Sequence, residues 1–183
     1  MKLYLLRHAE RGHGKEQDTL TLKGIKQSRK IVPYLETLHI DKIICANTKR
    51  AIKTIEPFLK NLSVEVTSLV NEQEMGSLRG KSGTEYRNAI EKSGLDKKNF
   101  RPEGGENYYD LIERAKKFLY SLKKEKAENI LISTHAGFIR AVIKLLLNLP
   151  EEKLKFDFGS VTFIELDREF KVINYSLNQI VNP

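Results

Sequence analysis

The sequence predicts an α/β fold, specifically a three-layer α/β/α sandwich with a largely parallel central sheet. Three observations support this prediction. Short apolar runs that suit buried strands alternate along the chain with amphipathic segments that suit helices. The chain has 183 residues, which is enough for one domain with a sizeable core. Its 40% apolar and 31% charged residues are ordinary for a globular protein, and we detect no internal repeat or linker. We therefore treat residues 1–183 as a single domain.

The first predicted strand and helix come from the first 35 residues. Residues 2–7 are a compact apolar run that stops at a charged pair, which favours a short buried strand. A polar, glycine-containing loop follows over residues 10–18. Thr21 can cap the next helix, whose apolar face extends over residues 22–35, and Pro33 predicts a kink or a new turn within that helix.

The middle of the chain contains two more short strands and a long irregular stretch. Residues 42–45 and 64–66 suit strands, and between them Asn47 can cap a helix. Residues 71–98 are polar and contain four glycines. We interpret about 71–101 as an excursion beside the active site, with a short helix near residues 84–91.

The last part of the chain returns to regular structure. A clear amphipathic helix is predicted over residues 108–122, followed by a continuous apolar strand at 129–133. Residues 137–147 are apolar nearly all round, which predicts a buried helix. Residues 161–166 and 172–175 suggest a closing hairpin.

Composition excludes several classes of protein. Cys45 is the only cysteine, so a disulfide framework and a multi-cysteine metal site are excluded, and Cys45 itself is expected to be a small buried hydrophobe. The net charge of +8 could attract anions, but the densest lysine cluster, at 116–126, is mixed with glutamates and fits a solvated helix face. No apolar run is long enough to span a membrane. We expect a cytoplasmic protein, a monomer or homodimer, with no nucleic-acid or membrane partner.

Two histidines and two arginines should meet at one edge of the sheet, because ligands of α/β sheets bind beyond the carboxyl ends of the strands. Arg7 and His8 come directly after the first strand, and His135 follows the 129–133 strand. Arg50 lies one turn into the helix that follows the second strand. Arginine presents a planar fork that matches phosphate oxygens. The helix start near Gly137 adds backbone N–H donors. This set of groups is suited to bind a dianionic phosphoryl group.

A neutral histidine beside such a pocket can attack phosphorus and form a phosphoenzyme. A carboxylic acid would then protonate the leaving oxygen. Position in the sequence leaves four candidates for that acid, which are Glu10, Glu72, Glu74 and Glu106.

At this point the sequence resembles a known family. Residues 5–10, Leu-Leu-Arg-His-Ala-Glu, resemble the Leu-x-Arg-His-Gly-Glu signature of the histidine phosphatase superfamily, the phosphoglycerate mutase-like proteins. Five further blocks resemble that family in the same order. They are Leu-Thr-Leu-Lys-Gly-Ile-Lys-Gln at 20–27, Arg-Ala-Ile-Lys-Thr at 50–54, Asn-Glu-Gln-Glu-Met-Gly-Ser-Leu-Arg-Gly at 71–80, Pro-Glu-Gly-Gly-Glu at 102–106 and Ser-Thr-His-Ala-Gly at 133–137. The resemblance therefore covers nearly the whole chain.

The resemblance implies a phosphoglycerate mutase-like fold and a role for each residue of the pocket. His8 would be the nucleophile, while Arg7, Arg50 and His135 would bind and stabilise the phosphoryl oxygens. Glu72, four residues before the glycine of its block, would be the acid rather than Glu74. No metal and no cofactor is implied.

Some positions depart from the family pattern. Gly14 stands where many members carry a phosphate-contacting Asn, and Arg11, His13 or Lys15 could supply compensating positive charge. We expect Arg11, Ala136 and Glu106 to contribute to substrate binding. Glu106 would do so as a partner of Arg50 or Arg7, or would instead cap the following helix.

The predicted function is a metal-independent phosphomonoester hydrolase that acts through a phosphohistidine on a small phosphorylated metabolite. The short segment between Gly80 and Arg101 favours hydrolysis over phosphoglycerate mutase activity, since the resemblance implies longer lid insertions in mutases. A phosphoprotein phosphatase and a catalytically silent phosphate-binding regulatory module remain as alternatives. The resemblance implies that phosphoprotein substrates are often served by members without the acid, so Glu72 disfavours the first, and the presence of both His8 and Glu72 disfavours the second.

Overall fold

The computed structural model describes residues 1–12, 18–59, 63–150 and 154–180. Its centre is a six-stranded mixed sheet with the strand order β3-β2-β4-β1-β5-β6. Strands β3, β2, β4 and β1 run parallel to one another, β5 runs antiparallel to β1, and β6 runs antiparallel to β5. The strands are β1 (Lys2–Arg7), β2 (Lys42–Ala46), β3 (Val64–Thr67), β4 (Asn129–Thr134), β5 (Val161–Leu166) and β6 (Val172–Gln179). The prediction of a largely parallel sheet closed by a hairpin is confirmed.

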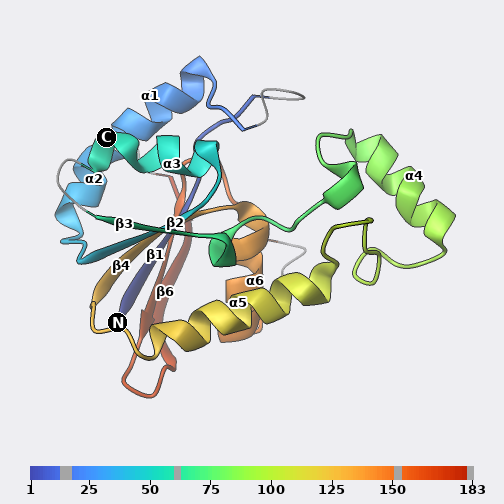
Figure 1. Cartoon of the computed structure of the whole chain (residues 1–183). Coiled ribbons are helices and arrows are strands. Elements are labelled where there is room, and N and C mark those ends of the chain that lie inside the picture. The colour runs from blue at the N-terminus through green and yellow to red at the C-terminus, as the bar shows by residue number, and fades with distance from the viewer. Residues whose placement is uncertain (13–17, 60–62, 151–153, 181–183) are drawn as a thin grey trace.

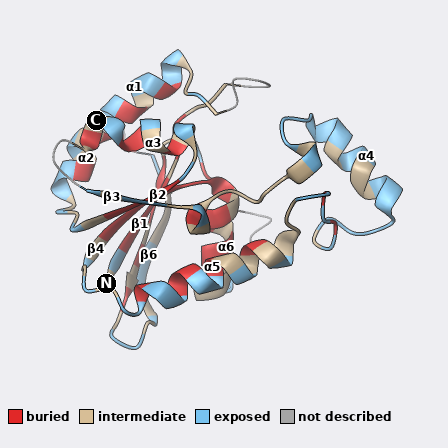
Figure 2. Ribbon diagram, viewed as in Figure 1, coloured by how far each residue is buried: buried red, intermediate tan, exposed pale blue. Residues whose placement is uncertain are grey.

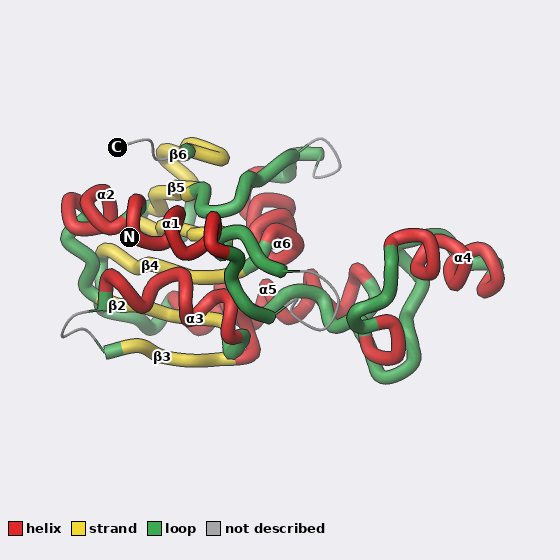
Figure 3. Tube along the Cα trace, turned by 90° about the horizontal axis from the view of Figure 1, so that it is seen from above, coloured by secondary structure: helices red, strands yellow, loops and turns green. Residues whose placement is uncertain are grey.

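Helices cover both faces of this sheet (Figure 1). One layer holds α1, α2 and α3, and the opposite layer holds α5 and α6, which is the predicted three-layer arrangement (Figure 3). The helices are α1 (Leu22–Lys30), α2 (Val32–Thr37), α3 (Lys49–Ile55), α4 (Gly83–Ser93), α5 (Tyr108–Leu122) and α6 (Ala136–Leu147). None of the described helices is both long and apolar enough to cross a membrane.

The helix ends follow local chemistry that the sequence partly predicted. The Thr21 hydroxyl accepts the N–H of Gly24, which caps α1 as expected. The chain breaks at Ile31, and Pro33 lies in the first turn of the separate helix α2, where its missing N–H costs nothing. The expected cap of α3 is wrong. Thr48, rather than Asn47, occupies its N-cap position, because Asn47 is engaged with the side chain of Asn71.

The core is built from the parallel strands and the helix faces packed on them (Figure 2). The interior residues of β1, β2 and β4 are almost completely buried, as are Phe118 of α5 and Phe138 of α6, whose rings lie 5.5 Å apart. Cys45 is buried in β2, and burial raises the pKa of its thiol to about 12, which confirms its role as a small core residue.

Helix α4 differs from the other helices because none of its residues is buried. It lies well away from the sheet and both helix layers in two perpendicular views (Figures 1 and 3). A capping box between Ser82 and Glu85 begins the helix, and Gly94 ends it in the left-handed conformation with φ of 67°. Tyr86 contacts Phe100, with ring centroids 5.8 Å apart. Local signals therefore define α4 with little help from burial.

Candidate active site

Register in the sheet brings the two histidines together. Strands β1 and β4 are parallel neighbours, and Arg7 is paired with Thr134 at their carboxyl ends. His8 and His135 are therefore the next residues of adjacent strands, and the backbone N–H of His8 donates to the Thr134 carbonyl at 2.9 Å. Their ring centroids lie 5.0 Å apart, and their exposed fractions are only 3% and 0%. Two strands more than a hundred residues apart in sequence thus create one buried histidine pair.

The surroundings of His8 keep it neutral with a defined tautomer. Its Nδ1 lies 2.8 Å from the Ala9 carbonyl, which can only accept, so Nδ1 carries the proton and Nε2 carries the lone pair. Burial lowers the pKa of His8 to about 3, the hydrogen bond to Ala9 opposes this shift, and the positive charges of Arg50 and Arg7 add to it. A neutral imidazole with a lone pair on Nε2 is the form that can act as a nucleophile.

Arg50 connects helix α3 to the histidine pair. Its Nη1 donates to Asp18 at 2.9 Å and its Nη2 to Nδ1 of His135 at 3.3 Å. Because a guanidinium cannot accept, Nδ1 of His135 holds a lone pair, and its Nε2–H can donate to the Thr48 hydroxyl at 3.2 Å. Burial, followed by the charge of Arg50, lowers the pKa of His135 well below its usual value.

Arg7 is held by residues far along the chain. Its Nη1 donates to the Phe156 carbonyl, and its guanidinium carbon lies 3.8 Å from the ring centre of Phe158. The Nε atoms of Arg7 and Arg50 are both buried and have no hydrogen-bond partner among the described residues. Buried donors of this kind are costly unless an anion satisfies them. The cluster formed by Arg7, His8, Arg50 and His135, called the strand-end cluster below, is therefore prepared to bind an anion.

Glu72 is the carboxylate that faces the strand-end cluster. Its Oε2 accepts the N–H of Gly137 at the start of α6, at 3.2 Å. Its negative charge raises the pKa of both Arg7 and Arg50, which opposes the lowering effect of burial. The approach to α6 is so close that a Cβ at position 137 would lie 1.9 Å from Oε1 of Glu72. Only glycine at 137 permits this contact.

The other three candidate acids, Glu10, Glu74 and Glu106, have different partners. Glu10 forms an ion pair with Lys23 at 2.9 Å. Glu74 binds the exposed side chain of Arg79 and accepts the N–H of Gly76 at 3.0 Å. The structure therefore brings Glu72, and not Glu74, next to the strand-end cluster.

The expectations for Glu106 need correction. Its carboxylate binds the Arg114 guanidinium through two hydrogen bonds, of 2.8 and 2.7 Å, instead of Arg50 or Arg7. Helix α5 is capped by Asn107 in a capping box with Asp110, so Glu106 is not the cap either. Both roles expected for Glu106 are wrong, because Arg114 lies two turns along α5 on the face turned toward this carboxylate.

The remaining predicted positions are distributed around the cluster. Arg11 lines the adjoining cavity, and its charge lowers the pKa of His8 and His135. Ala136 is the first residue of α6 and is 8% exposed. Gly14, together with His13 and Lys15, lies outside the residues that the structure describes. The prediction about a missing phosphate contact at position 14 is therefore untested.

A polar cavity of about 470 Å³ adjoins the cluster. Arg50 belongs to the cluster and also lines the cavity, and Thr48 and Glu72 lie between the two. A phosphate held by the arginines would therefore extend its ester group into this space. The cavity is lined by Arg11, Asp18, Asn47, Thr48, Arg50, Asn71, Glu72, Gln73, Glu74, Met75, Arg79 and Gly80. Among these side chains, Met75 is the one large apolar group.

Sequence reasoning missed four residues that shape the site. Asp18 and Thr48 orient Arg50 and His135, Phe158 lies against both Arg7 and His8, and Arg114 holds the Glu72 loop. Asp18 and Thr48 could have been suspected because they neighbour recognised motifs. Phe158 and Arg114 carry no local signal, since their contacts are made across the fold.

The described residues contain no group of three or more His, Cys, Asp or Glu side chains arranged to hold a metal ion.

The comparison with protein families decides the classification. The family profile of the histidine phosphatase superfamily (branch 1) matches residues 3–178. The chain belongs to the histidine phosphatase superfamily. The resemblance of its six motif blocks is thereby confirmed.

Several relatives to which this chain is similar are named as phosphatases. The chain is 25% identical to an adenosylcobalamin/alpha-ribazole phosphatase of Escherichia coli, with 94% of each chain covered. It is 27% identical to a putative phosphoserine phosphatase 2 of Hydrogenobacter thermophilus, covering 98% of this chain and 96% of the relative. The alpha-ribazole phosphatase of Shigella flexneri has the same fold, with a TM-score of 0.82, 24% identity and coverage of 98% and 96%. These relatives support a phosphatase activity for this chain.

Proposed function

We propose that the protein is a phosphomonoester hydrolase that works through a phosphohistidine on His8 and uses neither a metal nor a cofactor. One observation carries the proposal. The neutral His8, with its lone pair on Nε2, is buried near two arginines whose Nε donors have no partner among the described residues. A phosphate ester that satisfies these donors would place its phosphorus next to Nε2.

In the first step, Nε2 of His8 attacks phosphorus and the bond from phosphorus to the ester oxygen breaks. Arg7, Arg50 and His135 stabilise the charge on the non-bridging oxygens. Glu72, in its protonated form, gives its proton to the departing alcohol. The products of this step are the free alcohol, a phosphohistidine and the Glu72 carboxylate.

In the second step, Glu72 takes a proton from a water molecule, and the water oxygen attacks phosphorus. The bond between phosphorus and Nε2 breaks, which returns its electron pair to His8. Phosphate leaves, and Glu72 is again protonated for the next cycle. The same carboxyl therefore serves as acid and then as base.

The cavity supports a small, polar phosphate ester as substrate. Amide, hydroxyl and charged side chains line the space into which the ester group would extend, and Met75 is the single large apolar residue there. The relatives named for alpha-ribazole and phosphoserine phosphatase activities also act on small metabolites. Selection among such esters would fall to the side chains that line the cavity.

The test is hydrolysis of para-nitrophenyl phosphate in excess EDTA by the wild-type protein and by His8→Ala. We expect turnover by the wild type, a phosphate adduct of +80 Da on the His8 peptide after rapid acid-free quenching, and loss of both in the variant. Turnover by His8→Ala at the wild-type rate would overturn the role of His8. Inactivity of both proteins would shift support to the mutase or the silent phosphate-binding module.

A further inference from the structure

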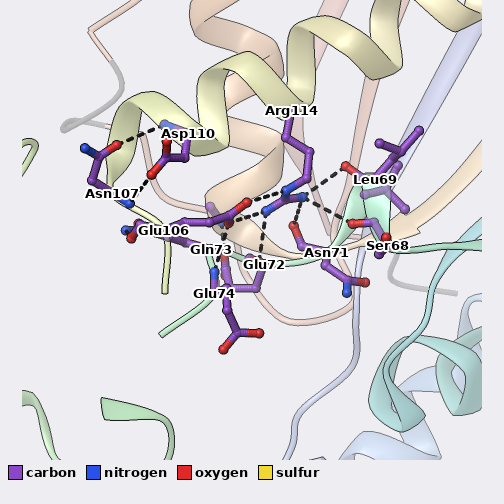
Figure 4. A network of polar contacts seen from close by, with 12 residues as sticks. Ser68, Leu69, Asn71, Glu72, Gln73, Glu74, Glu106, Asn107, Asp110 and Arg114 are labelled. Atoms are coloured by element: carbon purple, nitrogen blue, oxygen red, sulfur yellow. Dashed lines mark hydrogen bonds and ion pairs between the residues drawn. The ribbon is translucent and has the colours of Figure 1, made fainter. Parts of the chain in front are cut away.

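The segment that carries Glu72 is held by one partly buried arginine. Arg114, on helix α5, is only 14% exposed and sends its guanidinium into the space between α5 and the chain leading to Glu72 (Figure 4). Its Nη1 donates to the carbonyls of Leu69 at 3.0 Å and Asn71 at 2.9 Å, and Nη2 donates to the Glu72 carbonyl at 3.1 Å. A single guanidinium thus satisfies carbonyls at the end of the short 3-10 helix Ser68–Val70 and in the loop that follows it.

Glu106 holds the same segment through both its carboxylate and its main chain. Its carboxylate binds Nε and Nη2 of Arg114, and its Oε2 also accepts the backbone N–H of Glu74 at 3.0 Å. The main chain of Glu106 adds two contacts, because its N–H donates to the Glu74 carbonyl at 2.8 Å and its carbonyl accepts from the Gln73 side chain at 2.7 Å. Residues 71–74 are therefore fixed on both sides of Glu72.

The carboxyl group of Glu72 itself has a narrow range of productive positions. It accepts the N–H of Gly137 and acts electrostatically on the two arginines of the strand-end cluster, while its backbone belongs to the loop held by Arg114. A shift of about 1 Å in the loop would move the proton donor out of reach of the ester oxygen, and displacements of this size can cost about 10²-fold in rate.

We propose that Arg114, together with Glu106, is a positioning pair that sets the Glu72 carboxyl for proton transfer. This inference rests on the proposed function, because it assigns the pair an effect only on steps in which Glu72 gives or takes a proton. Neither Arg114 nor Glu106 needs to touch the substrate. Their effect acts through the backbone of residues 71–74.

The test compares two esters and separates the two steps. Para-nitrophenolate leaves without protonation, so its release in the first turnover reports attack by His8 alone. Glycerol 2-phosphate has a poor leaving group and needs the acid. For Arg114→Met we expect a first-turnover burst of nitrophenol within about threefold of wild type. We expect turnover of glycerol 2-phosphate to fall by about 10²-fold.

A double-mutant cycle identifies the route of the effect. In a Glu72→Gln background, Arg114→Met should cause little further loss on glycerol 2-phosphate, because both changes remove the same proton transfer. Arg114→Lys keeps a positive charge and should recover part of the activity, since one ammonium group cannot reach all the carbonyls that the fork reaches. Glu106→Gln preserves the shape of its side chain and should give a smaller loss of the same pattern.

Arg101→Met is the matched control. Arg101 pairs with Asp110 of α5 at 2.7 Å, but it is 56% exposed and forms no hydrogen bond or ion pair with the described residues 68–74. It should behave like the wild type on both esters. Equal losses of Arg114→Met on both esters, or a full additional loss in the Glu72→Gln background, would overturn the proposal in favour of a general folding role. Thermal unfolding of each variant accompanies the kinetics.

Failure of the proposed function would look different. Wild-type protein without a nitrophenol burst, or Glu72→Gln without an effect on glycerol 2-phosphate, would remove His8 or Glu72 from the mechanism. A normal wild type and an impaired Glu72→Gln, combined with an unaffected Arg114→Met, would instead reject the positioning pair alone.

Discussion

The two halves of the candidate active site are built in different ways. The strand-end cluster sits at the carboxyl ends of β1 and β4 and beside α3, where its groups are buried against the core. Glu72 belongs to the excursion, whose helix α4 buries no residue. Burial fixes the phosphate-binding half, whereas hydrogen bonds from Arg114 and Glu106 fix the acid half. For the proposed mechanism, the comparison predicts that changes around the site disturb proton transfer by Glu72 more easily than attack by His8.

The largest effect should come from the buried half. Arg50→Met removes donors to Asp18 and His135 and one of the two unpartnered Nε groups. We expect kcat/KM to fall by about 10²- to 10³-fold on aryl and alkyl phosphates alike, because the lost charge stabilisation is independent of the leaving group. Steady-state kinetics with both esters measures this.

Lys53→Met is the control for that experiment. Lys53 lies on the same helix, α3, but pairs with Glu56 on the surface and is 57% exposed. Its activity should match the wild type. If Arg50→Met lost activity on alkyl phosphates only, the proposed division between a phosphate-binding half and an acid half would be wrong.

A smaller and selective effect should come from the junction of the two halves. Gly137→Ala would place a Cβ 1.9 Å from Oε1 of Glu72 and force the carboxyl away from α6. We expect about a tenfold or greater loss on glycerol 2-phosphate and a smaller loss in the nitrophenol burst. Gly83→Ala in α4 is the control, because its Cβ would meet only Arg87 at 3.6 Å. Equal losses on both esters would contradict a specific effect on Glu72.

The buried histidines also predict how stability depends on pH. The pKa of His8 is lowered to about 3 in the folded protein, while the unfolded chain takes up a proton near pH 6.5. The contribution of neutral His8 to the free energy of unfolding is therefore fully present above pH 6.5. It falls as the pH drops from 6.5 toward 3, by about 1.4 kcal/mol per pH unit. Urea unfolding at pH 7, 6 and 5 should show a shallower slope for His8→Gln. An unchanged slope would show that folding does not lower the pKa of His8.

The smallest effect on activity should come from α4. Ser82→Ala removes the capping box with Glu85 and should cost about 1 kcal/mol of local helix stability. Amide hydrogen exchange in residues 83–93 should then speed up by about fivefold, while the nitrophenol burst stays within twofold of wild type. A large fall in the burst would show that α4 supports the strand-end cluster as well.

The sequence was sufficient for much of this site because several of its signals are local. Apolar runs followed at once by Arg7-His8 and Thr134-His135 identify strand ends, and parallel strands place such ends at one edge. Arg50 follows from its place in the first turn of the next helix. The choice of Glu72 over Glu74, in contrast, came from family resemblance, because two carboxylates two residues apart on a loop are indistinguishable by pattern.

Only the tertiary structure decided how these groups are partnered. Glu106 was expected to serve Arg50 or Arg7 or to cap α5, yet Arg114 takes its carboxylate and Asn107 provides the cap. Phe158 beneath Arg7, and Asp18 beside Arg50, are likewise contacts between distant segments. Strand ends and helix faces can be predicted from the spacing of apolar residues along a short stretch of sequence. The partner of a polar side chain instead depends on which distant segments pack against it. The sequence by itself therefore determined that the residues of the strand-end cluster meet at one edge of the sheet, and the fold determined how they are held.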